Sequence, residues 1–387
     1  MALSITQIPP VLNLAQSPIP ITLAENTNVI TSSSFQYVLD LYYWSGGINA
    51  SGSAAQYTLV KYPNNSGVGI FDVSRILNST LTDLLEANPS NVKFFAAEGY
   101  FEFLSGSTYV TGSHVRTDTF KYIDGYSIFQ EPISQSIEQK TPHWPLMTDG
   151  PATQSSFDFN GGVAGVYVGG YGSGSQPTKI VYTSNLGTAD YFLSSSASSS
   201  GQIDDYPVGQ SQSGFPFTGS LEYFTTQAFS GSVAIGTPIR YNLTCNQKYP
   251  NIRIKWKNRY GQFDWFNFNM INTKNFMVNR SLYQPQIGTW EGSSLSYNRY
   301  DSNNLNYMVD TKENIQVNTD WVDEAYNEIF KQLLVSDEIY WVYDEANNYV
   351  RPITIATSNL TFKTGVVEKV IQYSFEFAYG QTYKLVI

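Results

Sequence analysis

Residues 251–270, with the sequence NIRIKWKNRYGQFDWFNFNM, constrain the fold more than any other stretch of this chain. Its first half alternates apolar and basic residues: Ile252, Arg253, Ile254, Lys255, Trp256 and Lys257. A period of two predicts a strand with one dry face and one wet face. Asn258 and Gly261, which tolerate positive φ, then break the pattern and predict a turn. Because a lone hairpin is marginal in water, this aromatic-rich hairpin must be covered on both faces.

The second strand of this hairpin places Phe263 and Trp265 on one face and Phe266 and Phe268 on the other. We expect these rings, Trp265 included, to be core. Asp264 lies across the turn from the basic face of the first strand. That placement predicts a cross-strand charge pair worth ~0.2–1 kcal/mol.

Composition points to an all-β protein with neutral, polar surfaces. Charged residues make up 14% of the 387 residues and aromatic residues 15%. Aromatic residues favour strands, and the abundant Ser, Asn and Gly favour turns. A chain this long predicts two or three domains. The net charge of −10 argues against nucleic-acid binding, which needs clustered Lys and Arg.

The cysteine count and the N-terminal sequence indicate in which cellular compartment the chain folds. The lone Cys245 cannot form an internal disulfide, which fits folding in a reducing cytoplasm. The first 20 residues carry four prolines and no basic segment, so we do not expect a signal peptide. No window approaches 18 uninterrupted apolar residues, and we expect no membrane insertion.

The first half of the chain divides by composition into an arm and a domain. Residues 1–30 carry prolines that exclude a helix, and we expect an extended N-terminal arm. Its apolar residues favour docking on a neighbouring subunit over a disordered tail. Residues 31–140 predict a β-sandwich, with Tyr37, Leu39, Leu41 and Tyr43 on one strand face. Asp72 or Ser74 caps its one short helix.

The second half predicts two further parts. Residues 141–240 are a smaller Gly/Ser-rich β region with biased runs at 161–175 and 194–201. Residues 241–387 predict a β-sandwich with one amphipathic helix at about 320–336, capped by Thr319 or Asp320. Strict alternation predicts a closing strand within 370–379 whose inward face is Ile371, Tyr373, Phe375, Phe377 and Tyr379.

The sequence predicts no catalytic, cofactor-binding or metal-binding residue. His114 and His143 lie in turn-like contexts, His143 in what we read as a linker, without a metal-ligand partner at short spacing. Cys245 has no nearby histidine and favours a small apolar role. Most of the aromatic residues alternate with polar ones on strands, which favours core positions over sugar-stacking platforms.

Two acid pairs are candidates for the carboxylates of a glycosidase. Glu98 and Glu102 share a strand face, but four residues separate their Cα atoms by ~13 Å, beyond the ~5–9.5 Å that catalytic pairs need. Asp204 and Asp205 are neighbours in a predicted polar loop and should diverge. Both pairs are expected at solvated surfaces. No phosphate-binding motif occurs among the glycines of 161–175.

Several strings in this sequence resemble virion proteins of tailed phages that infect Bacteroidota, crAss-like phages included. They are NRYGQFDWFNF, the helix within 321–334, VSDEIYWV, a Pro-Ile-Thr-Ile strand, YSFEFAYG and, upstream, YPNNSGVGIFDVSRIL. These cover roughly half of the chain in two blocks. The chain departs from the family where Gln262 replaces a second glycine after Gly261. The middle region carries none of the resemblance.

The resemblance implies a non-enzymatic component of the tail, collar or fibre-attachment region, assembled in the host cytoplasm and located in the virion. Neutral polar faces and long loops suit heterologous contacts that close under rotation. The expected partners are copies of itself and other tail or portal-proximal proteins. The alternatives are a receptor- or carbohydrate-binding adhesin that contacts a host-surface glycan and, less favoured, a hydrolase of envelope polymers.

Overall fold

The chain folds into two compact units, each built mainly from β-strands. The computed structural model describes residues 3–26, 28–32, 34–46, 54–81, 92–128, 131–157, 161–169, 176–193, 201–243, 248–286, 288–344, 349–362, 370–380 and 384–386. Unit 1 comprises residues 1–245 and 257–264, and unit 2 comprises residues 246–256 and 265–387. Strands hold 52% of residues and helices 8%, which confirms the mainly β prediction with sandwich-type domains. The division differs from the predicted boundaries at 140 and 240.

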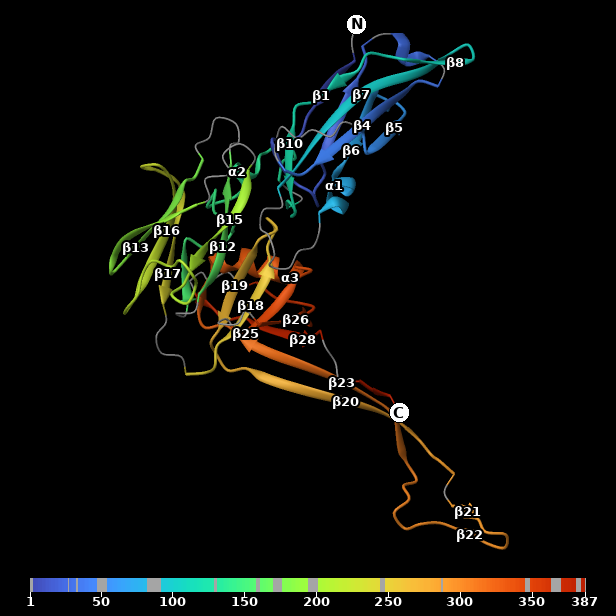
Figure 1. Cartoon of the computed structure of the whole chain (residues 1–387), viewed down its shortest axis with the longest axis vertical. Helices are drawn as coiled ribbons and strands as arrows, with labels where there is room; N and C mark the ends of the chain where they lie inside the picture. Colours follow the sequence, from blue (N-terminus) through green and yellow to red (C-terminus); the bar gives the residue numbers. More distant parts are fainter. Residues whose placement is uncertain are drawn as a thin grey trace. The chain divides into compact units, whose positions relative to one another are not determined.

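Unit 1 contains four sheets (Figure 1). Its elements up to residue 140 are β1 (Ser4–Gln7), β2 (Leu12–Leu14), β3 (Pro20–Ala24), η1 (Asn28–Thr31), β4 (Gln36–Trp44), β5 (Tyr57–Lys61), β6 (Val68–Asp72), α1 (Ser74–Thr80), β7 (Lys93–Ser105), β8 (Thr108–Thr111), β9 (Val115–Arg116), β10 (Phe120–Ile123) and α2 (Ile137–Lys140). The later strands are β11 (Thr153–Phe157), β12 (Gly162–Val168), β13 (Lys179–Ser184), β14 (Gly187–Phe192), β15 (Gln202–Val208), β16 (Tyr223–Ser230) and β17 (Val233–Leu243).

The first two sheets of unit 1 form a sandwich, in the order β1-β3-β6 and β2-β10-β7-β4-β5. Ile21 and Leu23 of β3 share one core with the inward face of β4. A Cβ atom at Gly99 of β7 would lie 2.5 Å from the Leu23 Cδ2 atom, so the glycine lets the two sheets approach. The prediction that Tyr37, Leu39 and Leu41 share a face is confirmed, since all three are buried in this core.

The prediction of a separate N-terminal arm is wrong. Residues 4–24 supply β1, β2 and β3, which pair with strands of unit 1 itself. The apolar side chains that suggested docking on a neighbour, such as Leu12, Ile19 and Ile21, are buried within the chain's own fold. Proline did not prevent pairing because Pro20 is the first residue of β3, a position where a missing donor is tolerated.

The middle region is more regular than its composition suggests. Strands β11-β17-β16-β13-β14 form one sheet and β12-β15 another. Tyr182 of β13 donates a hydrogen bond of 2.7 Å to the Pro207 carbonyl of β15, which ties the two sheets together. The short strand predicted around Val163, Val166 and Val168 is confirmed as β12. Residues 170–175 and 194–200 of the two biased runs lie outside the described residues.

Unit 2 is one large sheet with a helix packed against it. Its elements are β18 (Ile252–Lys257), β19 (Phe263–Phe268), β20 (Thr273–Tyr283), β21 (Thr289–Trp290), β22 (Leu295–Ser296), β23 (Leu305–Asn318), β24 (Val322–Asp323), η3 (Glu324–Tyr326), α3 (Asn327–Val335), β25 (Ile339–Asp344), β26 (Tyr349–Ile355), β27 (Val370–Ile371), β28 (Ser374–Tyr379) and β29 (Lys384–Val386). The main sheet has the order β19-β18-β25-β26-β28-β23-β20.

The core of unit 2 confirms the closing strand. All five residues predicted for its inward face are buried in the same core, although the segment divides into β27 and β28. Phe330 of α3 lies 5.2 Å between ring centroids from both Phe266 and Phe375. Trp256 is fully buried in this core, whereas Trp265 is only half-buried. The Arg253 guanidinium carbon lies 4.9 Å from the centroid of the Trp265 ring. The prediction that Trp265 is core is therefore wrong.

The amphipathic helix exists but begins later than predicted. Val322 and Asp323 are extended and pair with Ile371 and Val370, so Trp321 is exposed and outside the helix. Asp323, rather than Thr319 or Asp320, caps the 3-10 turn η3 that precedes α3: its Oδ1 atom accepts a hydrogen bond of 2.9 Å from the Ala325 backbone. The N-cap of α3 itself, Tyr326, makes no side-chain capping bond. The N-cap of the short helix α1 is Val73, which makes no side-chain capping bond, so the predicted cap at Asp72 or Ser74 is not confirmed. Asp72, one residue earlier, accepts a hydrogen bond of 3.0 Å from the Ser74 backbone.

Candidate functional site

The turn of the β18–β19 hairpin, residues 257–264, lies in unit 1 and carries a buried cluster of hydrogen bonds and ion pairs. The Asn258 Oδ1 atom accepts hydrogen bonds of 3.0 Å from the backbones of Tyr260 and Gln262. Gly261 closes the turn at φ +71°, and a Cβ there would lie 2.8 Å from the Asp124 carbonyl. The predicted turn is confirmed, and its local bonds fix the direction of Arg259.

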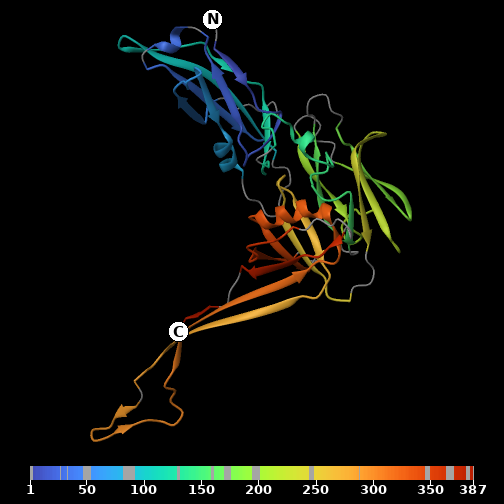
Figure 2. The ribbon, with the colours of Figure 1, turned by 180° about the vertical axis from the view of Figure 1, so that it is seen from behind.

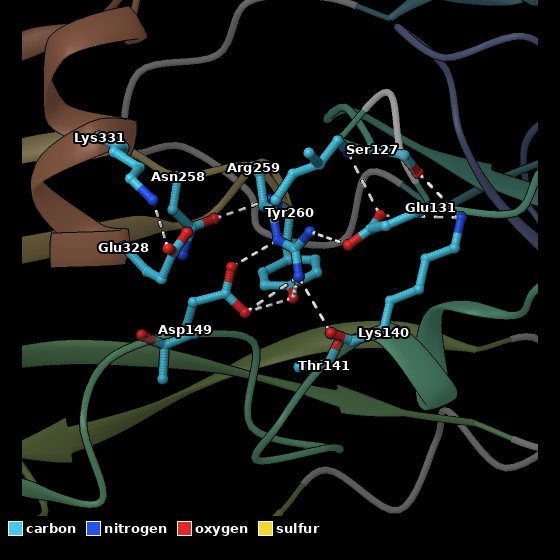
Figure 3. Close-up of polar contacts among 12 residues, drawn as sticks. Ser127, Glu131, Lys140, Thr141, Asp149, Asn258, Arg259, Tyr260, Glu328 and Lys331 are labelled. Atoms are coloured by element: carbon cyan, nitrogen blue, oxygen red, sulfur yellow. Dashed lines mark hydrogen bonds and ion pairs between the residues drawn. The ribbon is translucent and has the colours of Figure 1, made fainter. Parts of the chain in front are cut away.

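Arg259 is buried and fully engaged with acids of unit 1 (Figure 3). Its Nε atom lies 2.5 Å from Asp149 and its Nη1 atom 2.5 Å from Glu131. Its Nη2 atom donates to the Lys140 carbonyl at 3.0 Å and to the Tyr260 hydroxyl at 2.6 Å. Tyr260 in turn donates to Asp149 at 2.6 Å. We call Arg259, Tyr260, Asp149, Glu131 and Lys140 the Arg259 cluster.

In the Arg259 cluster, the positive charge of Arg259 is paired with the carboxylates of Asp149 and Glu131. Burial alone lowers the pKa of Arg259, but the Asp149 and Glu131 carboxylates raise it above its ordinary value. Burial and the Asp149 charge raise the pKa of Tyr260. Each guanidinium nitrogen of Arg259 therefore has at least one partner in the chain, and these contacts fix the turn.

The predicted charge pair at Asp264 does not form. Lys257 of the opposite strand instead lies 2.5 Å from Asp124. The Asp264 Oδ2 atom is buried without a hydrogen-bond partner in the described part of the chain. Burial raises the pKa of Asp264 to about 7, the Asp149 charge adds to this, and hydrogen bonds from Asn258 and Thr148 oppose it. The charged form of Asp264 is therefore less favourable in the folded state than in the unfolded state.

The two acid pairs considered from the sequence do not converge on a common point. Glu98 of β7 accepts from the Tyr42 hydroxyl at 3.1 Å and contacts His114 at 3.2 Å. Glu102 accepts from the Gln36 side chain at 3.1 Å. Each carboxylate thus has separate partners along the strand.

Asp204 and Asp205 are not in a loop. They are successive residues of β15, opposite Val166 and Gly165, so their side chains point to opposite faces.

The two histidines have local partners. His143 is not in an exposed linker: it is buried, and its ring nitrogens lie 2.7 Å from the Thr237 hydroxyl and 2.8 Å from the Gly150 carbonyl. His114 is exposed and stacks on Tyr100 with 4.4 Å between ring centroids. Cys245 lies outside the described residues. Within the described chain, no three His, Cys, Asp or Glu residues are grouped so as to hold a metal ion.

The feature that sequence reasoning missed is a long exposed hairpin in unit 2. Strands β20 and β23 pair along their length and lead to the small pair β21–β22 (Figures 1 and 2). All residues of β20 are exposed. We call residues 273–286 and 288–313 the β-arm.

Large apolar side chains cover the β-arm without being buried. Eleven of them are at least 40% exposed: Phe276, Met277, Val278, Leu282, Tyr283, Trp290, Leu295, Tyr297, Tyr300, Leu305 and Tyr307. The expectation that most aromatic residues are core fails here. At about 150–200 Å² for a large side chain, these expose on the order of 1,000 Å² of surface. Successive residues such as Phe276 and Met277 point to opposite faces of the strand, so this total is divided between the two faces of the β-arm. Large exposed apolar surfaces are typical of interaction sites.

Comparisons with known proteins do not identify a family. No protein-family model matches the chain, and no curated protein matches it in sequence. Among solved structures, one similar chain is that of the crystal structure of Salmonella alpha-2-macroglobulin mutant Y1175G, with 8% sequence identity and a TM-score of 0.16. That match covers 100% of this chain and 34% of the other, so the chain spans about a third of the protein it matches. None of the described helices has the length and apolar character needed to span a bilayer.

Proposed function

We propose that this chain is a non-enzymatic structural subunit of a tailed-phage virion, present in multiple copies in the tail, collar or fibre-attachment region. The observation that carries the proposal is the exposed apolar surface of the β-arm. A standard interface buries about 800 Å² on each partner, and the apolar side chains of the β-arm expose a total of that order over its two faces. The resemblance of the sequence strings to virion proteins supplies the kind of particle.

Two observations support a non-enzymatic role. Glu98 and Glu102 each have separate partners, and Arg259 is paired with Asp149 and Glu131. The partners we propose are copies of this chain and neighbouring tail or portal-proximal proteins, without nucleic-acid specificity or membrane insertion. Assembly takes place in the host cytoplasm, and the mature location is the virion. In this proposal, contact surfaces rather than reacting groups carry the function.

The test combines particle labelling with solution assembly. Antibody-decorated particles should show label at the tail or collar, in several copies. Purified protein should form a discrete oligomer by light scattering, and the triple variant F276S/V278S/L282S should shift it to monomer. The matched control, N275S/N279S, changes exposed polar residues of the same strand and should leave the oligomer intact. Unlabelled particles together with a monomeric wild-type protein would refute the proposal.

A second candidate, a receptor- or carbohydrate-binding adhesin of the particle, is favoured by the tip of the β-arm. Trp290, Tyr297 and Tyr300 are 67–84% exposed there, and aromatic rings with free faces are the usual platforms for apolar and sugar contacts. Binding of the purified protein to host-surface glycans on an array, lost in W290A/Y300A, would establish this role. A hydrolase of envelope polymers is the least supported reading; release of reducing sugar from host envelope would test it.

A further inference from the structure

Strand β20 is an open sheet edge of unusual length and composition. It is the last strand of its sheet and pairs only with β23 among the described strands. Its eleven residues contain no proline and only two charged residues, Lys274 and Arg280. Proteins normally blunt such edges with proline, charge, bulges or short strands, because an open edge recruits another strand. Of these devices, β20 has two charged residues and a register irregularity between Ser281 and Leu282, but it has no proline and runs regularly from Thr273 to Ser281. This long regular edge favours pairing with another strand in the assembled state.

The same chain contains an edge suited to pair with β20. Strand β5 ends the second sheet of unit 1 and pairs only with β4 among the described strands. Tyr57 and Val60 of β5, with Tyr62 just after it, are 45–70% exposed. Among the other edges, β8 exposes Tyr109 and Val110, and β14 exposes Phe192 beside Gly187, Thr188 and Asp190, whereas β11 reads TQSSF. Strand β5 has the largest apolar share of these strands, with three of its five residues, Tyr57, Leu59 and Val60. Strand β19, although aromatic, is largely covered.

Charge and area also favour a second copy as the partner. Residues 273–313 contain four basic residues, Lys274, Arg280, Arg299 and Lys312, and four acidic ones, Glu291, Asp301, Asp310 and Glu313. The net charge of this segment is therefore zero in a chain of net charge −10. Docking on a second acidic copy consequently meets no overall like-charge repulsion. Summed over the whole β-arm, the exposed apolar surface is of the order of one side of a standard interface.

We propose that β20 of one copy adds as a strand to the open edge of β5 of a second copy. This inference rests on the proposed function and names the contact through which the copies assemble. Backbone hydrogen bonds supply the pairing, and side chains such as Phe276 and Val278 of β20 cover Val60 and Tyr62. Because donor and acceptor are different surfaces, each copy gives one strand and receives another. Such a contact closes into a ring or extends as a filament.

The experiment uses full-length protein in a C245S background with one introduced cysteine per chain. N279C marks β20, K61C marks β5, and T188C marks the competing edge β14; all three positions are exposed. Single-cysteine proteins are mixed in pairs, treated with a short bismaleimide and separated by size. We expect cross-linked dimer from the N279C–K61C mixture and none from N279C–T188C or from N279C alone. The arm variant F276S/V278S/L282S should abolish the product.

The outcomes separate this inference from the proposed function. Dimer from N279C alone would mean that β20 pairs with itself, and dimer from N279C–T188C would mean that β14 is the acceptor; either overturns the inference. Absence of any product from an oligomer that light scattering still detects also overturns it while leaving the proposed function standing. A wild-type protein that stays monomeric at all concentrations contradicts both.

Discussion

The buried carboxyl group of Asp264 should make the folded state less stable as the pH rises. Its pKa is raised from 3.8 to about 7 in the folded chain, chiefly by burial. A raised carboxyl pKa means that the native state binds the proton more tightly than the unfolded state. The penalty is absent below pH 4, grows between pH 4 and 7, and is complete above pH 7. The slope in that window is about −1.4 kcal/mol per pH unit, and the full penalty is about 4 kcal/mol.

The assay compares wild-type protein with D264N by urea unfolding at pH 4 to 8. Asparagine keeps the shape of the side chain and cannot ionise, so D264N should match the wild type near pH 4. At pH 8 it should be more stable by up to about 4 kcal/mol. The control variant D118N removes an exposed carboxylate of unit 1 and corrects for the change in net charge. A D264N–wild-type difference that stays constant from pH 4 to 8 would refute the reasoning.

Two further predictions concern packing and the Arg259 cluster. W256A should lower the free energy of unfolding by about 3–5 kcal/mol because it empties a fully buried site. W265A removes a half-buried ring and should cost less than half of that. Equal losses for the two variants in chemical denaturation would contradict this assignment. R259M should cost about 3–5 kcal/mol by removing the positive charge that neutralises the buried Asp149 carboxylate. Adding D149N should restore part of the loss, and strictly additive losses in the double variant would show that the two residues are not coupled.

Local alternation predicted the strands whose side chains fill a core. The closing segment and β4 follow a strict period of two, and their inward residues are the buried ones. Alternation could not distinguish Trp256 from Trp265, because the hairpin is covered on both faces and burial is set by segments distant in sequence. The N-terminal segment was misread for a similar reason: its prolines obscured β3, which is defined by pairing with β6.

The candidate surfaces were harder to predict than the fold. Arg259 and Asp149 are 110 residues apart, and no local pattern indicates that they meet. The β-arm was missed because Phe276, Val278 and Leu282 look like core residues of any strand. A sequence shows that a side chain is apolar, but only the three-dimensional arrangement shows whether the chain covers it or leaves it for another molecule.

The membership of residues 257–264 in unit 1 constrains how the protein is made. Tyr260 completes a buried core that also contains Leu12, Trp144 and Tyr167. During synthesis, the ribosome must therefore deliver the first strand of unit 2 and its turn before unit 1 can finish folding. A nascent chain stalled near residue 245 would have all the sheets of unit 1 but lack this last piece, so its maturation is coupled to that of the unit that follows.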